Sequence, residues 1–251
     1  MVLLGRSPER CRETRELIAQ ECGRAPDLLL CDLGQRDEID RAAQTWLALG
    51  RPLHVLINNA GLVNLRRRLT EDGLEQTFAV NYLAHFQLTA RLLPRLHESA
   101  PARIVNVSSD THRIASLDLD DLAARRRYSM MGAYARSKLA IVHFTLELAR
   151  RLRGSGVTAN AVDPGPVESR IGQNNPGRAA DLLTLVMRHG FPDADWAART
   201  AVWLAASPEL EGQSGGYYKY GRRRPPRTGR DPDLGRRLWE LSAALTSSSC
   251  T

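Results

Sequence analysis

The sequence has 251 residues, of which 43% are hydrophobic and 25% charged, and its formal net charge is +7. This length and composition fit one packed domain and exclude a chain that is disordered throughout. The apolar runs are too short for a membrane span or a signal peptide, and the four cysteines include no CxxC pair that would indicate zinc or a disulfide framework. We therefore expect a cytoplasmic protein.

Helical and strand patterns alternate along the chain, which is typical of a parallel α/β sheet. We expect strands at residues 2–4, 28–31, 53–57, 104–107, 157–162 and 217–220. We expect helices at residues 8–22, 37–49, 73–96, 131–152, 194–206 and 231–245, the last one capped by Asp231 with Pro232 in its first turn. Only residues 222–230 look like a linker, which is basic. The sequence predicts a single domain over residues 1–251.

The positive charge does not by itself predict a nucleic-acid partner. Only two of the 35 basic residues are lysines, and the arginines are scattered, with clusters at 66–68, 125–127 and 222–224. Basic clusters attract phosphates nonspecifically. A composition-wide preference for arginine explains the scatter better than a binding patch does, so we predict no nucleic-acid function.

Small or polar residues follow two of the expected strands at their carboxyl ends, where parallel α/β folds bind ligands. Asn58-Asn59-Ala60-Gly61 comes directly after the strand at 53–57, and its small residues let a ligand approach the backbone closely. Ser108-Ser109 follows the strand at 104–107, where a hydroxyl can polarise a substrate carbonyl. Taken alone, each has a simpler interpretation, as an ordinary strand-to-helix turn or as a helix-capping serine.

Tyr134 and Lys138 lie four residues apart in an expected helix, so their side chains share one face. A free tyrosine has a pKa of about 10, which is too high for efficient proton transfer near neutrality, and a neighbouring ammonium lowers that pKa. The alternative interpretation is a Tyr–Lys pair on a solvated helix face. The chain contains only two lysines, and one of them lies at this spacing from a tyrosine, which favours a functional pair.

In this order and spacing, the motifs resemble the short-chain dehydrogenase/reductase family over about residues 2–220, with Asn81 in the long helix and Pro164-Gly165 after a strand as further matches. The resemblance implies a doubly wound, Rossmann-like parallel sheet that binds NAD or NADP. The catalytic residues that it implies are Asn81, which anchors a proton-relay water, Ser109, which hydrogen-bonds the reacting oxygen, Tyr134, which acts as the acid/base, and Lys138, which holds the ribose and lowers the tyrosine pKa. The cofactor-binding residues that it implies, besides Tyr134 and Lys138, are Asn59, Ala60 and Gly61 on the adenosine side, Asp32 and Leu33 beside the adenine, and Pro164, Gly165, Val167 and Ser169 at the nicotinamide.

A narrower resemblance concerns the branch of the family. Ser109 precedes Tyr134 by 25 residues, a longer gap than most classical members show. That gap, with the segments at 108–112, 117–122 and 237–242, resembles the retinol-dehydrogenase-like branch, which implies a lipophilic alcohol, aldehyde or ketone as the small-molecule substrate. The apolar residues 182–191 suit a lid over such a substrate and suit a helix packed on the core equally well.

We expect NADP rather than NAD as the cofactor. Family members that prefer NAD place an acidic residue at the end of the second strand. Residues 4–7 read Leu-Gly-Arg-Ser here, without a carboxylate, and the guanidinium of Arg6 can pair with a 2′-phosphate. The alternative interpretation of Arg6 is one more surface arginine.

Two features depart from the family pattern. His54 stands where many members carry Asp, and the chain begins at what resembles the second strand of the family. The first strand, which the family places between its second and fourth strands, is missing, as is the Thr-Gly-x-x-x-Gly-x-Gly turn that cradles the pyrophosphate. We therefore expect this chain to be a truncated form of a longer protein, with roughly 30–40 upstream residues that complete a βαβ unit.

The sequence thus predicts an NADP(H)-dependent oxidoreductase that transfers a hydride between nicotinamide and a carbonyl or alcohol carbon. The alternative from another class is a non-catalytic relative, or an inactive fragment, that cannot bind cofactor because the glycine turn is missing. A sugar-nucleotide epimerase also carries Tyr-x-x-x-Lys, but such enzymes usually need a larger carboxyl-terminal domain than 251 residues allow. Relatives often pair through their long helices, so the resemblance allows a homodimer.

Overall fold

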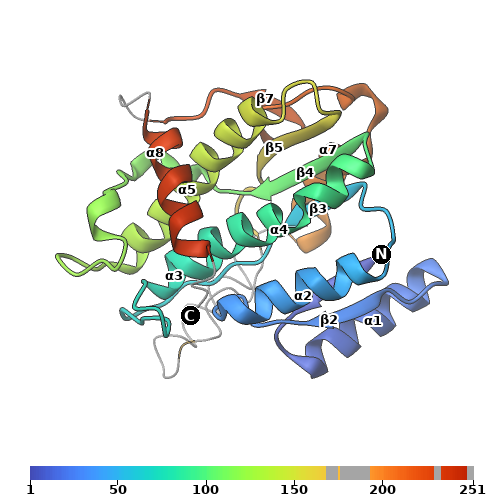
Figure 1. Ribbon diagram of the computed structural model, residues 1–251, viewed down its shortest axis with the longest axis horizontal. Helices are drawn as coiled ribbons and strands as arrows, with labels where there is room; N and C mark the ends of the chain where they lie inside the picture. Colours follow the sequence, from blue (N-terminus) through green and yellow to red (C-terminus); the bar gives the residue numbers. More distant parts are fainter. Residues whose placement is uncertain (168–174, 176–192, 229–232, 248–251) are drawn as a thin grey trace.

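The computed structural model describes residues 1–167, 175, 193–228 and 233–247 (Figure 1). Its strands are β1 (Val2–Gly5), β2 (Asp27–Leu30), β3 (Val55–Asn58), β4 (Ala102–Val107), β5 (Val157–Asp163), β6 (Tyr217–Lys219) and β7 (Arg222–Arg224). Its α-helices are α1 (Pro8–Cys22), α2 (Arg36–Ala48), α3 (Gln76–Phe78), α4 (Ala84–Glu98), α5 (Met130–Arg151), α7 (Ala194–Ala206) and α8 (Leu234–Thr246). The alternation of strands and helices that the sequence predicts is confirmed.

The strands form two separate ladders. β1 and β2 make a parallel pair in which Leu3 lies opposite Leu28, and the other strands form a sheet in the order β3-β4-β5-β6-β7. All pairs in the larger sheet are parallel except β6–β7. No backbone pairing joins the two ladders among the described residues, and Val55 and Ile57 of the edge strand β3 are exposed.

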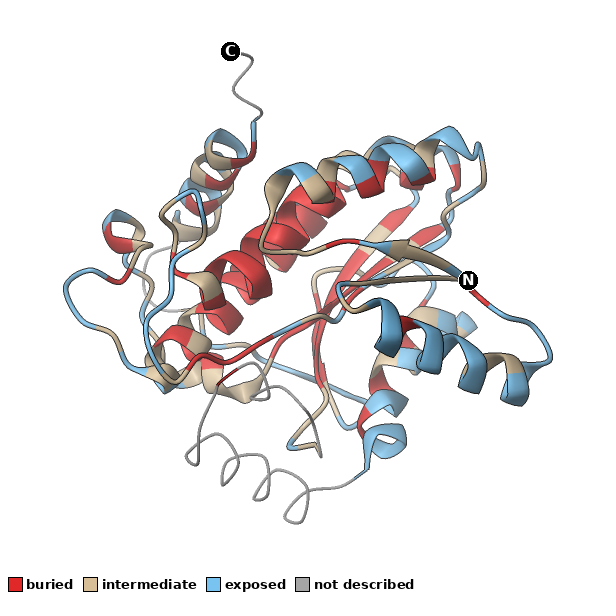
Figure 2. Ribbon diagram, turned by 90° about the horizontal axis from the view of Figure 1, so that it is seen from below, coloured by how far each residue is buried: buried red, intermediate tan, exposed pale blue. Residues whose placement is uncertain are grey.

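Helices cover both faces of the larger sheet because side chains on a strand point alternately to its two sides. Ala102 and Ile104 of β4 belong to a core formed with α4 and α5, whereas Val105 and Val107 pack with Leu204 of α7 on the other face. The predicted doubly wound arrangement is thus confirmed. Burial is concentrated on β4, β5 and α5, while α1 buries only Cys11 (Figure 2).

The helix that the sequence predicts over residues 73–96 begins later and is not uniform. The carboxylate of Glu75 accepts hydrogen bonds from the backbone N–H groups of Thr77 and Phe78 and so starts the helical run at α3. A π-helix (Ala79–Leu83) follows and leads directly into α4. A π-turn is rare and occurs frequently at functional sites. Here it contains Asn81.

The prediction of a linker at residues 222–230 is wrong for residues 222–224, because these form β7, which pairs with β6 as an antiparallel edge strand. Its three arginines are exposed. Residues 229–232, including the predicted cap Asp231 and Pro232, lie outside the described residues. The final helix is present as α8, where Leu238 is buried and Ser242 meets the Tyr82 hydroxyl at an O···O distance of 2.6 Å.

None of the helices among the described residues combines the length and the apolar character that crossing a membrane requires.

Candidate active site

The first turns of α5 carry Tyr134 and Lys138 to the carboxyl end of β4. The hydroxyl of Ser129 caps this helix by accepting the backbone N–H of Gly132 at 3.1 Å. The ammonium of Lys138 lies 5.5 Å from the centroid of the Tyr134 ring and donates a hydrogen bond to the carbonyl oxygen of Val107 at 2.8 Å. Lys138 is buried at 2% exposure, so the pairing is not a solvated helix face.

Ser109 stands at the same end of β4, directly after Ser108, whose side chain bonds β4 to α5. Ser108 donates its hydroxyl to the backbone carbonyl of Lys138 at 2.9 Å. The hydroxyl of Ser109 accepts the backbone N–H of Thr111 at 3.3 Å and caps a short 3₁₀-helix (Asp110–Ile114). It also faces the Tyr134 phenol and acts to lower its pKa. Ser109 is therefore a capping serine and a partner of the phenol at once.

The expected lowering of the tyrosine pKa is wrong for this arrangement. Burial, together with the charge of Asp163, raises the pKa of Tyr134 to about 12, although Ser109 opposes the rise. Burial also lowers the pKa of Lys138 to about 8, against the effect of Asp163. Desolvation of the phenolate outweighs the neighbouring ammonium, whose hydrogen bond goes to Val107. Tyr134 is consequently a protonated phenol near neutrality, suited to proton donation.

Asn81 joins the loop after β3 to α5 from within the π-helix. Its side-chain oxygen accepts the backbone N–H of Leu62 at 2.7 Å, and its side-chain nitrogen donates to the Leu62 carbonyl at 3.0 Å and to the Ser137 hydroxyl at 3.2 Å. Ser137 in turn donates to the backbone carbonyl of Tyr134 at 2.7 Å. Asn81 thus contacts α5 through Ser137, whose hydroxyl bonds the backbone of Tyr134.

The residues expected on the adenosine side are largely accessible. Asn59 and Gly61 are exposed and Ala60 is half-buried, whereas Asn58 is buried at the end of β3. The side-chain nitrogen of Asn58 donates to the hydroxyl of Thr89 at 2.9 Å and to the side-chain oxygen of Asn106 at 2.8 Å. This buried network holds the strand end in place.

Arg6 and Asp32 lie together at the carboxyl ends of β1 and β2. The Arg6 guanidinium is 3.8 Å from the Asp32 carboxylate, and both side chains retain access to solvent. The backbone N–H of Gly34 donates to Asp32 Oδ1 at 2.9 Å and fixes the turn. The half-buried Leu33 packs against the core between β2 and α2, so part of its side chain serves the fold.

The segment after β5 contains the residues expected at the nicotinamide. Gly165 has φ of +79°, and a Cβ there would lie 2.7 Å from the Tyr220 ring, so the position requires glycine. Pro164 lines a cleft of about 480 Å³ with aromatic residues of α7 and with Tyr220. Val167 is half-buried. Ser169 and the apolar stretch 182–191 lie outside the described residues.

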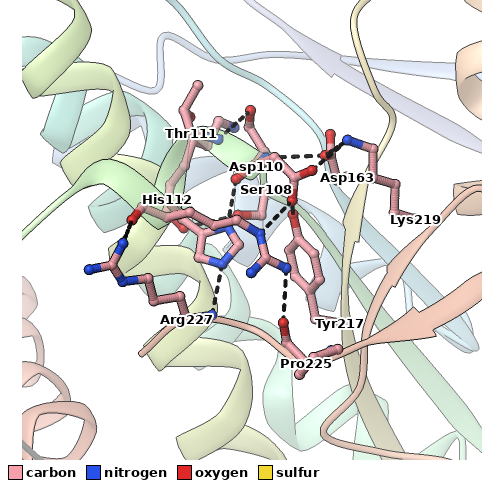
Figure 3. Close-up of polar contacts among 12 residues, drawn as sticks. Ser108, Asp110, Thr111, His112, Asp163, Tyr217, Lys219, Pro225 and Arg227 are labelled. Carbon is pink, nitrogen blue, oxygen red and sulfur yellow. Dashed lines mark hydrogen bonds and ion pairs between the residues drawn. The ribbon is translucent and has the colours of Figure 1, made fainter. Parts of the chain in front are cut away.

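A charged cluster behind Ser109 was not predicted from the sequence. Asp110, Asp163 and Lys219 come from the ends of three neighbouring strands and meet in one network of polar contacts (Figure 3). No local pattern reveals such a contact. The sequence offers one hint of this cluster, which is that Lys219 is one of only two lysines in the chain. In the structure both lysines lie beside the ends of these strands.

Comparison with known proteins agrees with this geometry. The family model described as short chain dehydrogenase matches residues 1–178. The chain is 40% identical to mouse polyprenol dehydrogenase over 261 aligned residues, which cover 99% of this chain and 76% of the relative. It is 43% identical to human retinol dehydrogenase 12 over 219 residues, which cover 85% of this chain and 67% of the relative.

Solved structures agree on the fold. An uncharacterised protein from Mycobacterium paratuberculosis superposes with a TM-score of 0.72 at 30% identity, covering 98% of this chain and 83% of that one. A short chain dehydrogenase from Shigella flexneri, solved in complex with NADP, superposes with a TM-score of 0.65 at 22% identity, covering 88% of this chain and 86% of that one. The chain therefore belongs to the short-chain dehydrogenase family of oxidoreductases, within the branch that is similar to retinol dehydrogenases.

Proposed function

We propose that this protein is an NADP(H)-dependent oxidoreductase that interconverts a lipophilic carbonyl compound and its alcohol. One observation carries the proposal: Ser109, Tyr134 and Lys138 converge at the carboxyl end of β4, where the Lys138 ammonium lies 5.5 Å from the Tyr134 ring and donates to the Val107 carbonyl, and where Ser109 acts on the pKa of the Tyr134 phenol. A hydrogen-bond donor, a proton donor and a cation at one place are what carbonyl reduction requires of a protein.

The donor set fits the nicotinamide ribose of a dinucleotide. The Lys138 ammonium has three hydrogens and gives one to Val107, so two remain for ribose hydroxyls. The exposed residues Asn59 and Gly61, the second without a side chain, suit close approach of the adenosine part. When bound, the cofactor supplies or accepts the hydride. The sequence contains no glycine-rich turn for the pyrophosphate, so this fit covers the nicotinamide ribose and the adenosine part and not the pyrophosphate between them.

The side chains then have distinct tasks in carbonyl reduction. The hydroxyl of Ser109 holds the substrate oxygen, and the protonated phenol of Tyr134 donates its proton to that oxygen as negative charge develops on it. Lys138 positions the ribose and places a positive charge beside the phenolate that proton donation leaves behind. Asn81 supports Tyr134 from behind through Ser137, and the family resemblance also assigns to it the anchoring of a proton-relay water.

The substrate class follows from the resemblance and from the relatives. Those relatives are named polyprenol dehydrogenase and retinol dehydrogenase, and both names denote dehydrogenases of long apolar alcohols. The cleft beside Pro164 does not add to this argument, because Arg199 and Glu209 line it together with the aromatic residues and none of the proposed catalytic residues does. We propose a lipophilic aldehyde, ketone or alcohol as the substrate and keep the homodimer and the cytoplasmic location as predictions.

The deciding experiment combines cofactor binding with a substrate panel. We expect the purified chain to quench or shift NADPH fluorescence on titration and to oxidise NADPH with long-chain aldehydes or ketones faster than with short polar ones. A chain that binds no dinucleotide in this titration would be the non-catalytic relative instead. Binding without turnover of any member of the panel would remove the proposed substrate class and leave the cofactor assignment standing.

A further inference from the structure

The cluster behind Ser109 is arranged around the second lysine of the chain. The ammonium of Lys219 lies 2.5 Å from Asp110 Oδ2 and 3.0 Å from Asp163 Oδ2 (Figure 3). Lys219 ends β6, Asp163 ends β5, and Asp110 follows Ser109 at the end of β4. One cation thus ties the carboxyl ends of three adjacent strands together at the place where Ser109 stands.

The two carboxylates differ in their surroundings. Asp163 is buried, and its oxygens accept the backbone N–H groups of Asp110 at 3.1 Å and of Gly165 at 2.8 Å. Asp110 is more exposed, and its Oδ1 accepts the Tyr217 hydroxyl at 3.0 Å and the Arg113 guanidinium at 3.2 Å. Burial alone would raise the pKa of Asp110, but hydrogen bonds from Lys219, Tyr217 and Arg113 lower it to about 2. Asp110 is therefore a carboxylate near neutrality.

Asp163 also acts on the catalytic helix. Its charge raises the pKa of Tyr134, after burial, and opposes the lowering of the pKa of Lys138. The groups that face the Tyr134 phenol are Ser109 after β4, Asp163 on β5 and Lys138 on α5 itself. The groups that face the Lys219 ammonium are Asp110, Asp163 and the ring of Tyr220. Tyr217 and Arg113 donate hydrogen bonds to Asp110, and the His112 ring packs against the ring of Tyr217.

We propose that Lys219 is a positioning residue for the reaction: it holds Asp110 and Asp163 together, which fixes Ser109 opposite Tyr134, and it offsets the Asp163 carboxylate that faces the phenol. This inference rests on the proposed function of Ser109 and Tyr134. Without the ammonium of Lys219, the buried carboxylate of Asp163 would have only backbone N–H groups as partners. Asp110 would also lose the ion pair that links it to β6.

The charge argument gives a signed expectation. In alcohol oxidation Tyr134 must act as a phenolate, so the rate rises as the pH rises toward the pKa of the phenol. Lys219→Met leaves the negative charge of Asp163 uncompensated and moves that rise to higher pH by about one pH unit, whereas Asp163→Asn moves it to lower pH. Lys219→Arg keeps the charge and should leave the profile near that of the wild type. Arg223→Met removes a charge from the exposed edge strand and serves as the matched control.

The experiment measures kcat and KM for alcohol oxidation by the full chain against pH in these four variants. Alkaline difference spectra between each variant and its Tyr134→Phe double variant report the phenol titration without catalysis. We expect opposite shifts of the pH profile for Lys219→Met and Asp163→Asn, and a fall in kcat of about tenfold for Lys219→Met. Lys219→Arg should keep both the pH profile and the kcat of the wild type.

Unmoved profiles and spectra in both variants, or an equal effect of Met and Arg at position 219, would overturn the inference. If Lys219→Met does not fold, the direction of the Asp163→Asn shift decides. If the wild type oxidises no alcohol, the proposed function fails, and the difference spectra still decide whether Lys219 and Asp163 control the phenol.

Discussion

The guanidinium of Arg6 at the end of β1 lies 3.8 Å from the carboxylate of Asp32 at the end of β2. The residue expected to recognise a 2′-phosphate is therefore already next to an anion. A phosphate at this place has to share the guanidinium with Asp32 or displace it, so the two side chains together set the preference between NADP and NAD.

Arg6→Ala should lower the ratio of kcat/KM for NADPH over NADH by about tenfold, because it removes the cation that pairs with the phosphate. Asp32→Asn should raise the same ratio, because it removes the competing carboxylate. Arg12→Ala on the exposed surface of α1 is the control. A wild type that favours NADH, or a ratio that none of these changes affects, contradicts the assignment of Arg6.

Tyr134→Phe should reduce turnover by about 10²–10⁴-fold while leaving the fold and NADPH binding intact, because only the acid/base hydroxyl is lost. The matched control is Tyr218→Phe, which removes the hydroxyl of a buried tyrosine that donates to Gln213 at 3.3 Å. Steady-state rates and thermal melting distinguish the two effects. Near-normal turnover by Tyr134→Phe would show that another group transfers the proton.

Lys138 should make the stability of the protein depend on pH in an unusual direction. Burial lowers its pKa to about 8 from the ordinary value of 10.5, so between these two values the unfolded chain binds more protons than the folded one. The free energy of unfolding should therefore rise with pH across this window and fall as the pH drops through about 8. Urea titrations of wild type and Lys138→Met at several pH values test this.

The Lys138→Met variant should lose that rise, because methionine has no proton to exchange. It should also bind NADPH more weakly and turn over more slowly, because the ribose donor and the cation are both gone. Parallel pH dependences in the two proteins would mean that the folded state keeps Lys138 charged throughout this range.

Ser242→Ala should destabilise the attachment of α8 by about 1–2 kcal/mol, because the buried hydroxyl of Tyr82 loses its partner at 2.6 Å. Ser247→Ala, at the exposed end of the same helix, removes a hydroxyl whose hydrogen bond is local and should change the free energy of unfolding little. Denaturant unfolding measures both. Equal effects of the two changes would contradict the role assigned to the Tyr82–Ser242 contact.

Local periodicity accounts for the parts of the site that the sequence predicts. A spacing of four residues puts Tyr134 and Lys138 on one helix face, and an apolar strand before Ser109 brings that residue to the sheet edge. The π-turn at Asn81 escapes prediction because one widened turn leaves the apolar pattern of a long helix almost unchanged.

Long-range contacts account for what the sequence does not predict. The pairing of β7 depends on β6, because Arg222–Arg224 has no strand-like alternation of its own. The meeting of Lys219 with Asp163 and Asp110 depends on the order of strands in the sheet. The raised pKa of Tyr134 depends on burial, which no four-residue motif encodes.

The arginine side chains of β7 have a consequence for how molecules of this protein meet one another. β7 is the last strand of the larger ladder, so its outer backbone groups would otherwise offer a template for another chain. A second copy that approached edge to edge would bring its own Arg222–Arg224 against the same three charges. Mutual repulsion therefore guards this edge against polymerisation, and the protection weakens as salt concentration rises and screens it.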